Sequence, residues 1–210
     1  MEKKKKKGMN LPNKITCARL VISVIVLVIL CFAKHDVGIA EAERSVIIFG
    51  VQIVDWLYLV AGALFAIGSI TDFLDGYIAR KNNIVTDFGK VMDAIADKVL
   101  VNPILIILAC NGFIPTIVPV IYITRDVVVD AIKMQAATKG KVQAAIKSGK
   151  YKTACMMVGL VLVFFYNIPF AFWNIRVDLG LLIIACVLAV VSAFEYYHIN
   201  KGILFSKSEK

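Results

Sequence analysis

Six long apolar runs alternate with short polar segments along the chain. They cover roughly residues 15–34, 51–80, 87–111, 114–137, 148–167 and 178–199. Runs of about 20 residues are long enough for an α-helix to cross a hydrocarbon core of about 30 Å. None of them alternates apolar and polar residues with a period of two, so helices are favoured over strands. The pattern predicts an all-α integral membrane protein, a bundle of six transmembrane helices.

Turn-forming residues separate the runs. Asn111-Gly112 and Pro115 predict a tight turn between the third and fourth helices, and the stretch NIPFAFWN ends the fifth. The connection at 34–50 is longer and mixed in charge, and we expect a short amphipathic or interfacial segment there. The first run is too long for the apolar part of a signal peptide, so we expect it to be retained. We expect a single membrane-embedded domain over 1–210, with a basic cytoplasmic segment at 1–14.

The composition supports a membrane protein. The chain of 210 residues is 60% hydrophobic and has a mean hydropathy of +0.79, whereas a soluble domain is about 45–50% apolar. Its five cysteines are scattered and form no CxxC pair. We therefore expect packed apolar thiols, without a disulfide framework or a zinc site.

Basic residues are distributed unevenly among the connections. If the N-terminus is cytoplasmic, the opposite side contains only Lys34, Arg44 and Arg176 of the 24 lysines and arginines. The positive-inside rule then predicts that both termini lie in the cytoplasm. The run Lys3–Lys7 either attracts anionic membrane lipids or merely sets this topology. The basic segments have no aromatic platform or reading element, so nucleic acid binding is not expected.

The segment TDFLDGYIARKNNIVTDFGKVMDAIADK gathers carboxylates between two apolar runs. Residues three or four apart share one face of a helix. The short polar loop at 81–86 turns the chain back, so the two helices are expected to be antiparallel neighbours whose faces converge. One face would carry Asp72, Asp75, Gly76 and Ala79, and the other Gly89, Asp93 and Asp97.

Four carboxylates at close range repel one another unless cations compensate them. An oxygen-only cluster without His or Cys is the kind that Mg²⁺, Mn²⁺ or Ca²⁺ prefers. The small residues leave room for a phosphate-bearing substrate that bridges such ions. Two alternatives remain open: an interhelical ion-pair cluster with Arg80, Lys90 and Lys98, and a pathway for protons or cations.

The spacing Asp72-x2-Asp75-Gly76-x2-Ala79-Arg80-x8-Gly89-x3-Asp93-x3-Asp97 resembles the signature of the CDP-alcohol phosphatidyltransferase family. The resemblance implies a metal-dependent transferase that joins a CDP-linked lipid to an alcohol, releases CMP and forms a homodimer. LPNKITCAR and DFLDGYIARKNNIVTDFGKVMDAIADK are most similar to members that transfer the phosphatidyl group of CDP-diacylglycerol to sn-glycerol 3-phosphate, for anionic phospholipid synthesis. Ala94 departs from the many relatives that carry proline at this position.

The resemblance also implies roles for individual residues. Two Mg²⁺ or Mn²⁺ ions would be held by Asp72, Asp75, Asp93 and Asp97, and Asp97 would also be the general base for the acceptor hydroxyl. The CDP-diacylglycerol site would include Gly76, Ala79, Arg80 and Gly89, with Thr16 and Arg19 on the nucleotide side.

An acceptor with a phosphate group needs cations of its own. Arg125 lies well inside the fourth run, where an unpaired charge is costly. Three lysines lie near the cytoplasmic start of the fifth. We expect glycerol 3-phosphate to bind at Arg125, Lys141, Lys150 and Lys152. The alternatives are a salt bridge from Arg125 to Asp126 or Asp130, and lysines that only set topology or attract headgroups.

We expect the active site at the cytoplasmic ends of the second and third helices, in the cell membrane. There it meets the pyrophosphate of the lipid at the depth of the headgroups while the acyl chains stay in the bilayer. The signature alone leaves the acceptor open, so a cardiolipin or phosphatidylserine synthase type of enzyme is the main alternative. A divalent-cation transporter is the alternative from a different class.

Overall fold

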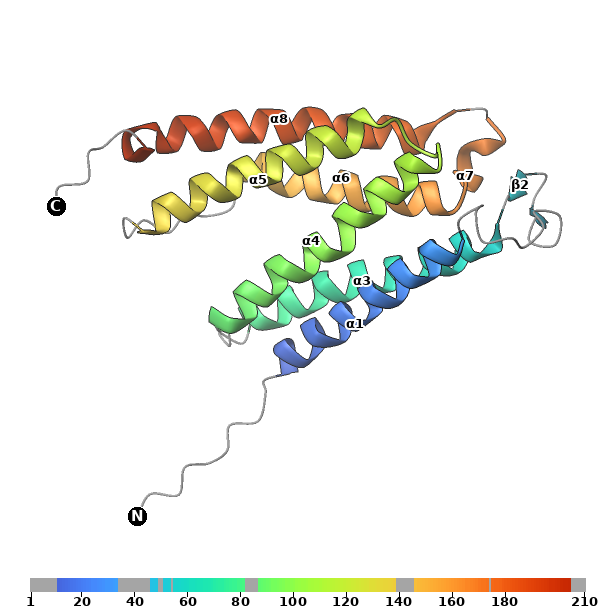
Figure 1. Cartoon of the computed structure of the whole chain (residues 1–210), viewed down its shortest axis with the longest axis horizontal. Helices are drawn as coiled ribbons and strands as arrows, with labels where there is room; N and C mark the ends of the chain where they lie inside the picture. Colours follow the sequence, from blue (N-terminus) through green and yellow to red (C-terminus); the bar gives the residue numbers. More distant parts are fainter. Residues whose placement is uncertain are drawn as a thin grey trace, which may run out of the picture. The chain divides into compact units, whose positions relative to one another are not determined.

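The computed structural model describes residues 11–33, 46–48, 51–53, 55–81, 87–138, 146–173 and 175–204. Within these ranges, side chains are described outside 11–14, 46–53, 73–94, 169 and 203–204. The chain divides into two compact units, Met1–Val46 with Gln52–Ile104, and Ile47–Val51 with Leu105–Lys210. Helices make up nearly all of the described chain (Figure 1).

The first unit contains α1 (Leu11–Phe32), α3 (Trp56–Lys81) and most of α4 (Asp87–Cys110). Helices α1 and α3 pack side by side (Figure 1). Asp55 caps the start of α3, because its Oδ1 accepts a hydrogen bond from the Leu57 N–H at 2.9 Å. The core of this unit is apolar, with fully buried side chains at Val26, Leu30, Ala61, Phe65 and Ala96.

Two short strands precede α3. They are β1 (Val46–Ile48) and β2 (Val51–Ile53), which form a two-stranded sheet. The predicted second helix began at residue 51, and this boundary is wrong. The apolar run continues through both elements, but the cap at Asp55 lets the helix begin only at Trp56.

The second unit contains α5 (Ile117–Thr138), α6 (Lys147–Phe164), the short α7 (Ile168–Ala171) and α8 (Val177–Leu204). Helix α8 packs against both α5 and α6 (Figure 1). The approach of α6 is close at Gly159, where a Cβ would lie 2.9 Å from Cδ2 of Leu182. Helix α8 is therefore the element that holds this unit together.

The predicted turns are confirmed. Gly112 adopts a φ of 75°, a left-handed conformation that glycine accepts without strain, between α4 and α5. Helix α6 ends at Phe164, where Tyr166 and Asn167 have φ values of 53° and 54°. The Asn167 side chain donates a hydrogen bond to the Ile175 carbonyl at 2.6 Å, which ties this turn to the chain just before α8.

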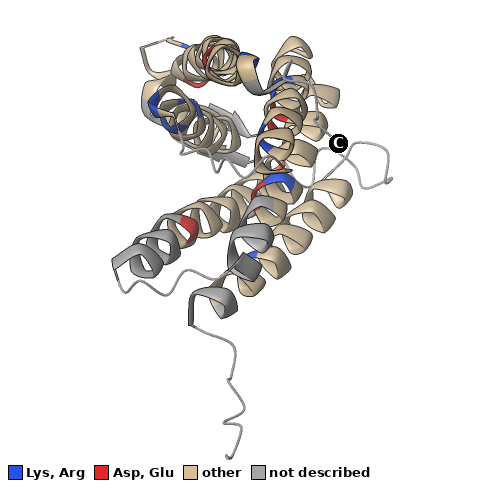
Figure 2. Ribbon diagram, turned by 90° about the vertical axis from the view of Figure 1, so that its left-hand side faces the viewer, with Lys and Arg blue, Asp and Glu red and all other residues tan. Residues whose placement is uncertain are grey.

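Six helices of 18 residues or more occur in the described part of the chain, one for each predicted run. Among the described residues, two segments, Ile15–Phe32 and Val177–Gly202, are long and apolar enough to cross a membrane. Uncharged residues occupy most of the described helices (Figure 2). Large apolar side chains are exposed on their outer faces, for example Val21, Ile67, Val127, Val158 and Phe194. An apolar exterior over apolar helices is typical of a membrane protein, whereas the count of six spans stays a prediction.

Candidate active site

The four signature aspartates belong to two helices of the first unit. Asp72 and Asp75 lie in α3, and Asp93 and Asp97 lie in α4. The spacings of three and four residues therefore fall within α-helix, so each pair shares a face. Asp72 and Asp97 are half-buried. The side chains of Asp75 and Asp93 lie outside the described residues, and so do those of the neighbouring site residues Gly76, Ala79, Arg80 and Gly89.

Arg19 of α1 forms an ion pair with Asp72 of α3. Its guanidinium is almost completely buried, whereas the Asp72 side chain is 42% exposed. Thr16 and Ser23 lie on the same face of α1 and are also buried. The sequence placed Arg19 at the nucleotide, and the structure places it beside a signature aspartate. Its position inside an apolar run was the signal that it needs a partner.

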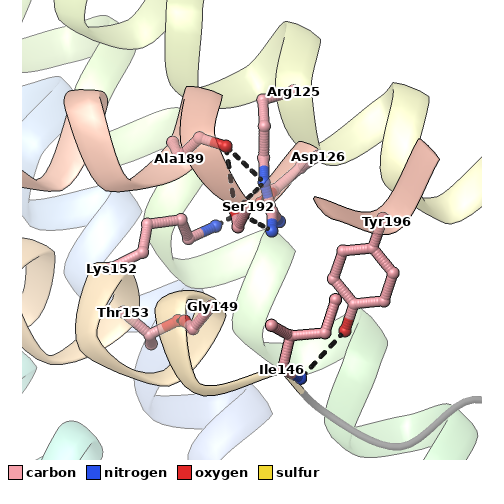
Figure 3. Close-up of polar contacts among 9 residues, drawn as sticks. All are labelled: Arg125, Asp126, Ile146, Gly149, Lys152, Thr153, Ala189, Ser192 and Tyr196. Atoms are coloured by element: carbon pink, nitrogen blue, oxygen red, sulfur yellow. Dashed lines mark hydrogen bonds and ion pairs between the residues drawn. The ribbon is translucent and has the colours of Figure 1, made fainter. Parts of the chain in front are cut away.

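A second cluster joins α5 to α6 in the second unit (Figure 3). Arg125 Nη1 and Lys152 Nζ each lie 2.8 Å from the same oxygen, Oδ1 of Asp126. All three side chains are largely buried, with exposed fractions of 10% for Arg125, 14% for Asp126 and 4% for Lys152. Two positively charged groups therefore meet at one carboxylate oxygen in a mostly apolar environment.

Helix α8 completes this cluster. Arg125 Nε donates to Ser192 Oγ at 3.1 Å and to the Ala189 carbonyl at 3.3 Å, and Nη2 donates to Ser192 Oγ at 2.6 Å. Aromatic rings lie beside both cations: Lys152 Nζ is 3.9 Å from the ring centre of Tyr122, and Arg125 Cζ is 5.9 Å from that of Tyr196. The cluster is thus built from three helices.

The predicted acceptor cations are only partly brought together. Arg125 and Lys152 meet at Asp126, which also bears out the alternative of a salt bridge between Arg125 and Asp126. Lys150 is exposed, and Lys141 lies outside the described residues. Sequence reasoning missed Ser192, Tyr122 and Tyr196, since no local pattern connects them with Arg125.

The aspartate spacing on α3 and α4 resembles the signature of one family of transferases. The sequence profile of the CDP-alcohol phosphatidyltransferase family matches residues 9–193, and the chain belongs to this family. The chain is 37% identical over 192 residues to a CDP-diacylglycerol–glycerol-3-phosphate 3-phosphatidyltransferase of Bacillus subtilis, with 91% of this chain and 95% of the relative covered.

Two further relatives carry the same name. One, from Rickettsia bellii, is 34% identical over 190 residues, with 90% of this chain and 93% of the relative covered. The other, from Mycoplasma genitalium, is 38% identical over 149 residues, with 71% of this chain and 62% of the relative covered. The similarity therefore extends over most of the chain.

The donor set of the signature is made only of carboxylate oxygens. Such a set fits Mg²⁺ or Mn²⁺ better than a metal that prefers nitrogen or sulfur ligands. Among the residues whose side chains are described, no group of three or more His, Cys, Asp or Glu side chains gathers. Asp75 and Asp93 lie outside that range, so the donor chemistry and the helical register are what support a metal site.

Proposed function

We propose that this chain transfers the phosphatidyl group of CDP-diacylglycerol to sn-glycerol 3-phosphate, giving phosphatidylglycerophosphate and CMP. This is the reaction of a phosphatidylglycerophosphate synthase, an enzyme of anionic phospholipid synthesis. The observation that carries the proposal is the similarity to the Bacillus subtilis relative, which covers 91% of this chain. The signature aspartates, all in helices of the first unit, supply the chemistry.

Asp72, Asp75, Asp93 and Asp97 would hold the divalent cations, two Mg²⁺ or Mn²⁺ ions by family resemblance. When bound, they would supply positive charge for the pyrophosphate and for the departing CMP. Arg19 holds Asp72 through their ion pair and so acts beside the metal ligands. We assign the nucleotide to the small residues of α3 and α4 and to neighbouring groups: Gly76, Ala79, Arg80, Gly89 and Thr16.

The acceptor hydroxyl oxygen forms a bond to the phosphorus that carries the diacylglycerol. The bond from that phosphorus to the oxygen of CMP breaks, and CMP leaves with the bonding electrons. We assign Asp97 as the group that accepts the proton of the hydroxyl. Most of the acceleration in such a transfer comes from positioning and charge stabilisation, which a cluster of carboxylates around cations provides.

We assign the phosphate of the acceptor to Arg125 and Lys152, with Lys150 and Lys141 as weaker contributors. The support is the charge of the cluster, in which two largely buried cations share Oδ1 of Asp126. Buried cations bind a phosphate group through charge-assisted hydrogen bonds, which are stronger than those between neutral groups. Arg can hold a phosphate through two parallel hydrogen bonds.

The proposed enzyme spans the cell membrane six times, with both termini and the active site on the cytoplasmic side. The support is the distribution of basic residues and the six long helices of the described chain. We further propose that it works as a homodimer, and that the run Lys3–Lys7 interacts with anionic lipids.

The test is a measurement of CMP release by the purified protein in lipid nanodiscs. The reaction contains CDP-diacylglycerol, Mg²⁺ and, in turn, glycerol 3-phosphate, glycerol, serine or phosphatidylglycerol. We expect rapid CMP release only with glycerol 3-phosphate. Release with serine or phosphatidylglycerol instead would assign the chain to another branch of the family. No release with any alcohol would leave the transporter as the better hypothesis.

A further inference from the structure

The hydrogen bonds of Arg125 occupy one particular edge of its guanidinium. The group is planar and has five N–H donors, arranged so that Nε–H and one Nη2–H lie parallel on its side edge. Ser192 Oγ lies 3.1 Å from Nε and 2.6 Å from Nη2, so it accepts from both donors of that edge. Asp126 Oδ1 accepts from Nη1 at 2.8 Å. These contacts use three of the five donors, and among the described residues one N–H of Nη1 and one of Nη2 have no acceptor.

The hydroxyl of Ser192 is itself held in one orientation. It donates to the Ala189 carbonyl at 2.8 Å, within its own helix. Its lone pairs then point to Arg125, because the single proton of the hydroxyl is already used. Ser192 is fully buried, so water does not compete for these bonds. Figure 3 shows the resulting chain from the Ala189 carbonyl through Ser192 to the guanidinium.

We infer that Ser192 is a positioning residue for the acceptor phosphate. It takes the side edge of the Arg125 guanidinium and leaves the remaining N–H groups of Nη1 and Nη2 for hydrogen bonds to phosphate oxygens. Ser192 does not contact the phosphate and acts only through Arg125. The inference rests on the proposed function, in which Arg125 binds the phosphate of glycerol 3-phosphate.

Substitutions at Ser192 separate the hydrogen bonds that the hydroxyl accepts from the space that the side chain fills. Ser192→Ala removes the oxygen that accepts the hydrogen bonds of Arg125. Ser192→Cys keeps a side chain of similar size, but its sulfur accepts hydrogen bonds much more weakly. Ser192→Thr keeps the hydroxyl and can still donate to a carbonyl one turn earlier. We expect the first two to raise the KM for glycerol 3-phosphate about 5- to 10-fold, the loss typical of one ordinary hydrogen bond, because Ser192 acts on the phosphate only through Arg125. Ser192→Thr should stay within about twofold of the wild type on the same scale.

The matched control is Ser23→Ala. Ser23 is also fully buried, but its hydroxyl bonds only to the Arg19 carbonyl of its own helix, at 2.8 Å. We expect the KM for glycerol 3-phosphate to stay unchanged in this variant. For all variants, kcat and the KM for CDP-diacylglycerol are measured together with the thermal unfolding temperature, so that a loss of folding is recognised.

A double-mutant cycle tests whether Ser192 acts through Arg125. Lysine has no guanidinium edge to orient, so Ser192→Ala in an Arg125→Lys background should change the KM for glycerol 3-phosphate less than about twofold, because the interaction it removes is already gone. An equal effect in both backgrounds overturns the inference, as does an equal rise in KM for both substrates.

The variant Arg125→Ala, measured in parallel, distinguishes a failure of the Ser192 inference from a failure of the proposed acceptor site. If Arg125→Ala raises the KM for glycerol 3-phosphate while Ser192→Ala and Ser192→Cys do not, the role of Ser192 is wrong and the acceptor site stands. If Arg125→Ala leaves this KM unchanged, Arg125 does not bind the phosphate of glycerol 3-phosphate, and the role of Ser192 is wrong as a consequence.

Discussion

Gly159 lies where α6 packs closely against α8. A Cβ at this position would lie 2.9 Å from Cδ2 and 3.2 Å from Cγ of Leu182, and 3.4 Å from Cβ of Leu181. Leu182 is fully buried, so it has little space into which it can move. At Gly180 of α8, by contrast, a Cβ would meet no atom within 4 Å. The two glycines therefore form a matched pair within one unit.

Both glycines lie in helices, so alanine favours the helix at either position, by about 0.8–1 kcal/mol in the interior of α6 and by less in the first turn of α8. The clash at Leu182 is then the main destabilising difference between the two variants. An extra methyl group in a packed core costs about 1–3 kcal/mol. At about 2–4 °C per kcal/mol for a chain of this size, Gly159→Ala should unfold roughly 2–12 °C below Gly180→Ala.

Thermal unfolding of both purified variants in the same detergent checks this difference. Gly159 lies two turns from Lys152 on the same face of α6, so the CMP-release assay on each variant shows whether the strain reaches the cation cluster. Equal unfolding temperatures for the two variants would refute the close approach of α6 to α8 at Gly159.

Four further predictions concern the reaction. Asp93→Asn should abolish transfer while the thermal unfolding temperature stays close to that of the wild type; near-normal turnover at saturating Mg²⁺ would contradict a metal site. Exhaustive chelation with EDTA should stop CMP release, and Mg²⁺ or Mn²⁺ should restore it; full activity in protein shown by elemental analysis to be free of metal would refute the requirement. Arg125→Ala should raise the KM for glycerol 3-phosphate about 30- to 150-fold, equivalent to about 2–3 kcal/mol, with little change in kcat. The exposed Lys150 should matter less than the buried Lys152 when each is replaced by alanine, as the same KM measurement will show.

The helices were predictable because each apolar run is long and polar segments separate the runs. The turn at Gly112, which has a left-handed backbone conformation, and the turn after Phe164 both lie where the sequence predicted a turn. The start of α3 was misplaced because apolarity does not distinguish a short strand from a helix end. Asp55, immediately before Trp56, was the local signal that would have corrected it.

The site was predictable only as far as local spacing extends. The signature aspartates repeat within two helices, and Asp126 is the immediate neighbour of Arg125, so both were visible in the sequence. Ser192 is 67 residues from Arg125, and its role depends on how α8 packs against α5. The pairing of Arg19 with Asp72 likewise depends on the packing of α1 against α3. Contacts of this kind follow from tertiary structure and leave no periodic trace in the sequence.

The sharing of Asp126 by Arg125 and Lys152 has a consequence for how the proposed enzyme rejects glycerol. Glycerol would fit wherever glycerol 3-phosphate fits, so shape alone cannot exclude it. A neutral alcohol in the acceptor site would leave without an acceptor the N–H groups that Arg125 would otherwise donate to the phosphate. Sites with buried polar groups reject an analogue that leaves those groups unsatisfied far more strongly than apolar pockets reject a change in size. Exclusion of glycerol would thus follow from hydrogen bonds that it cannot make, with no need for a side chain that blocks its entry.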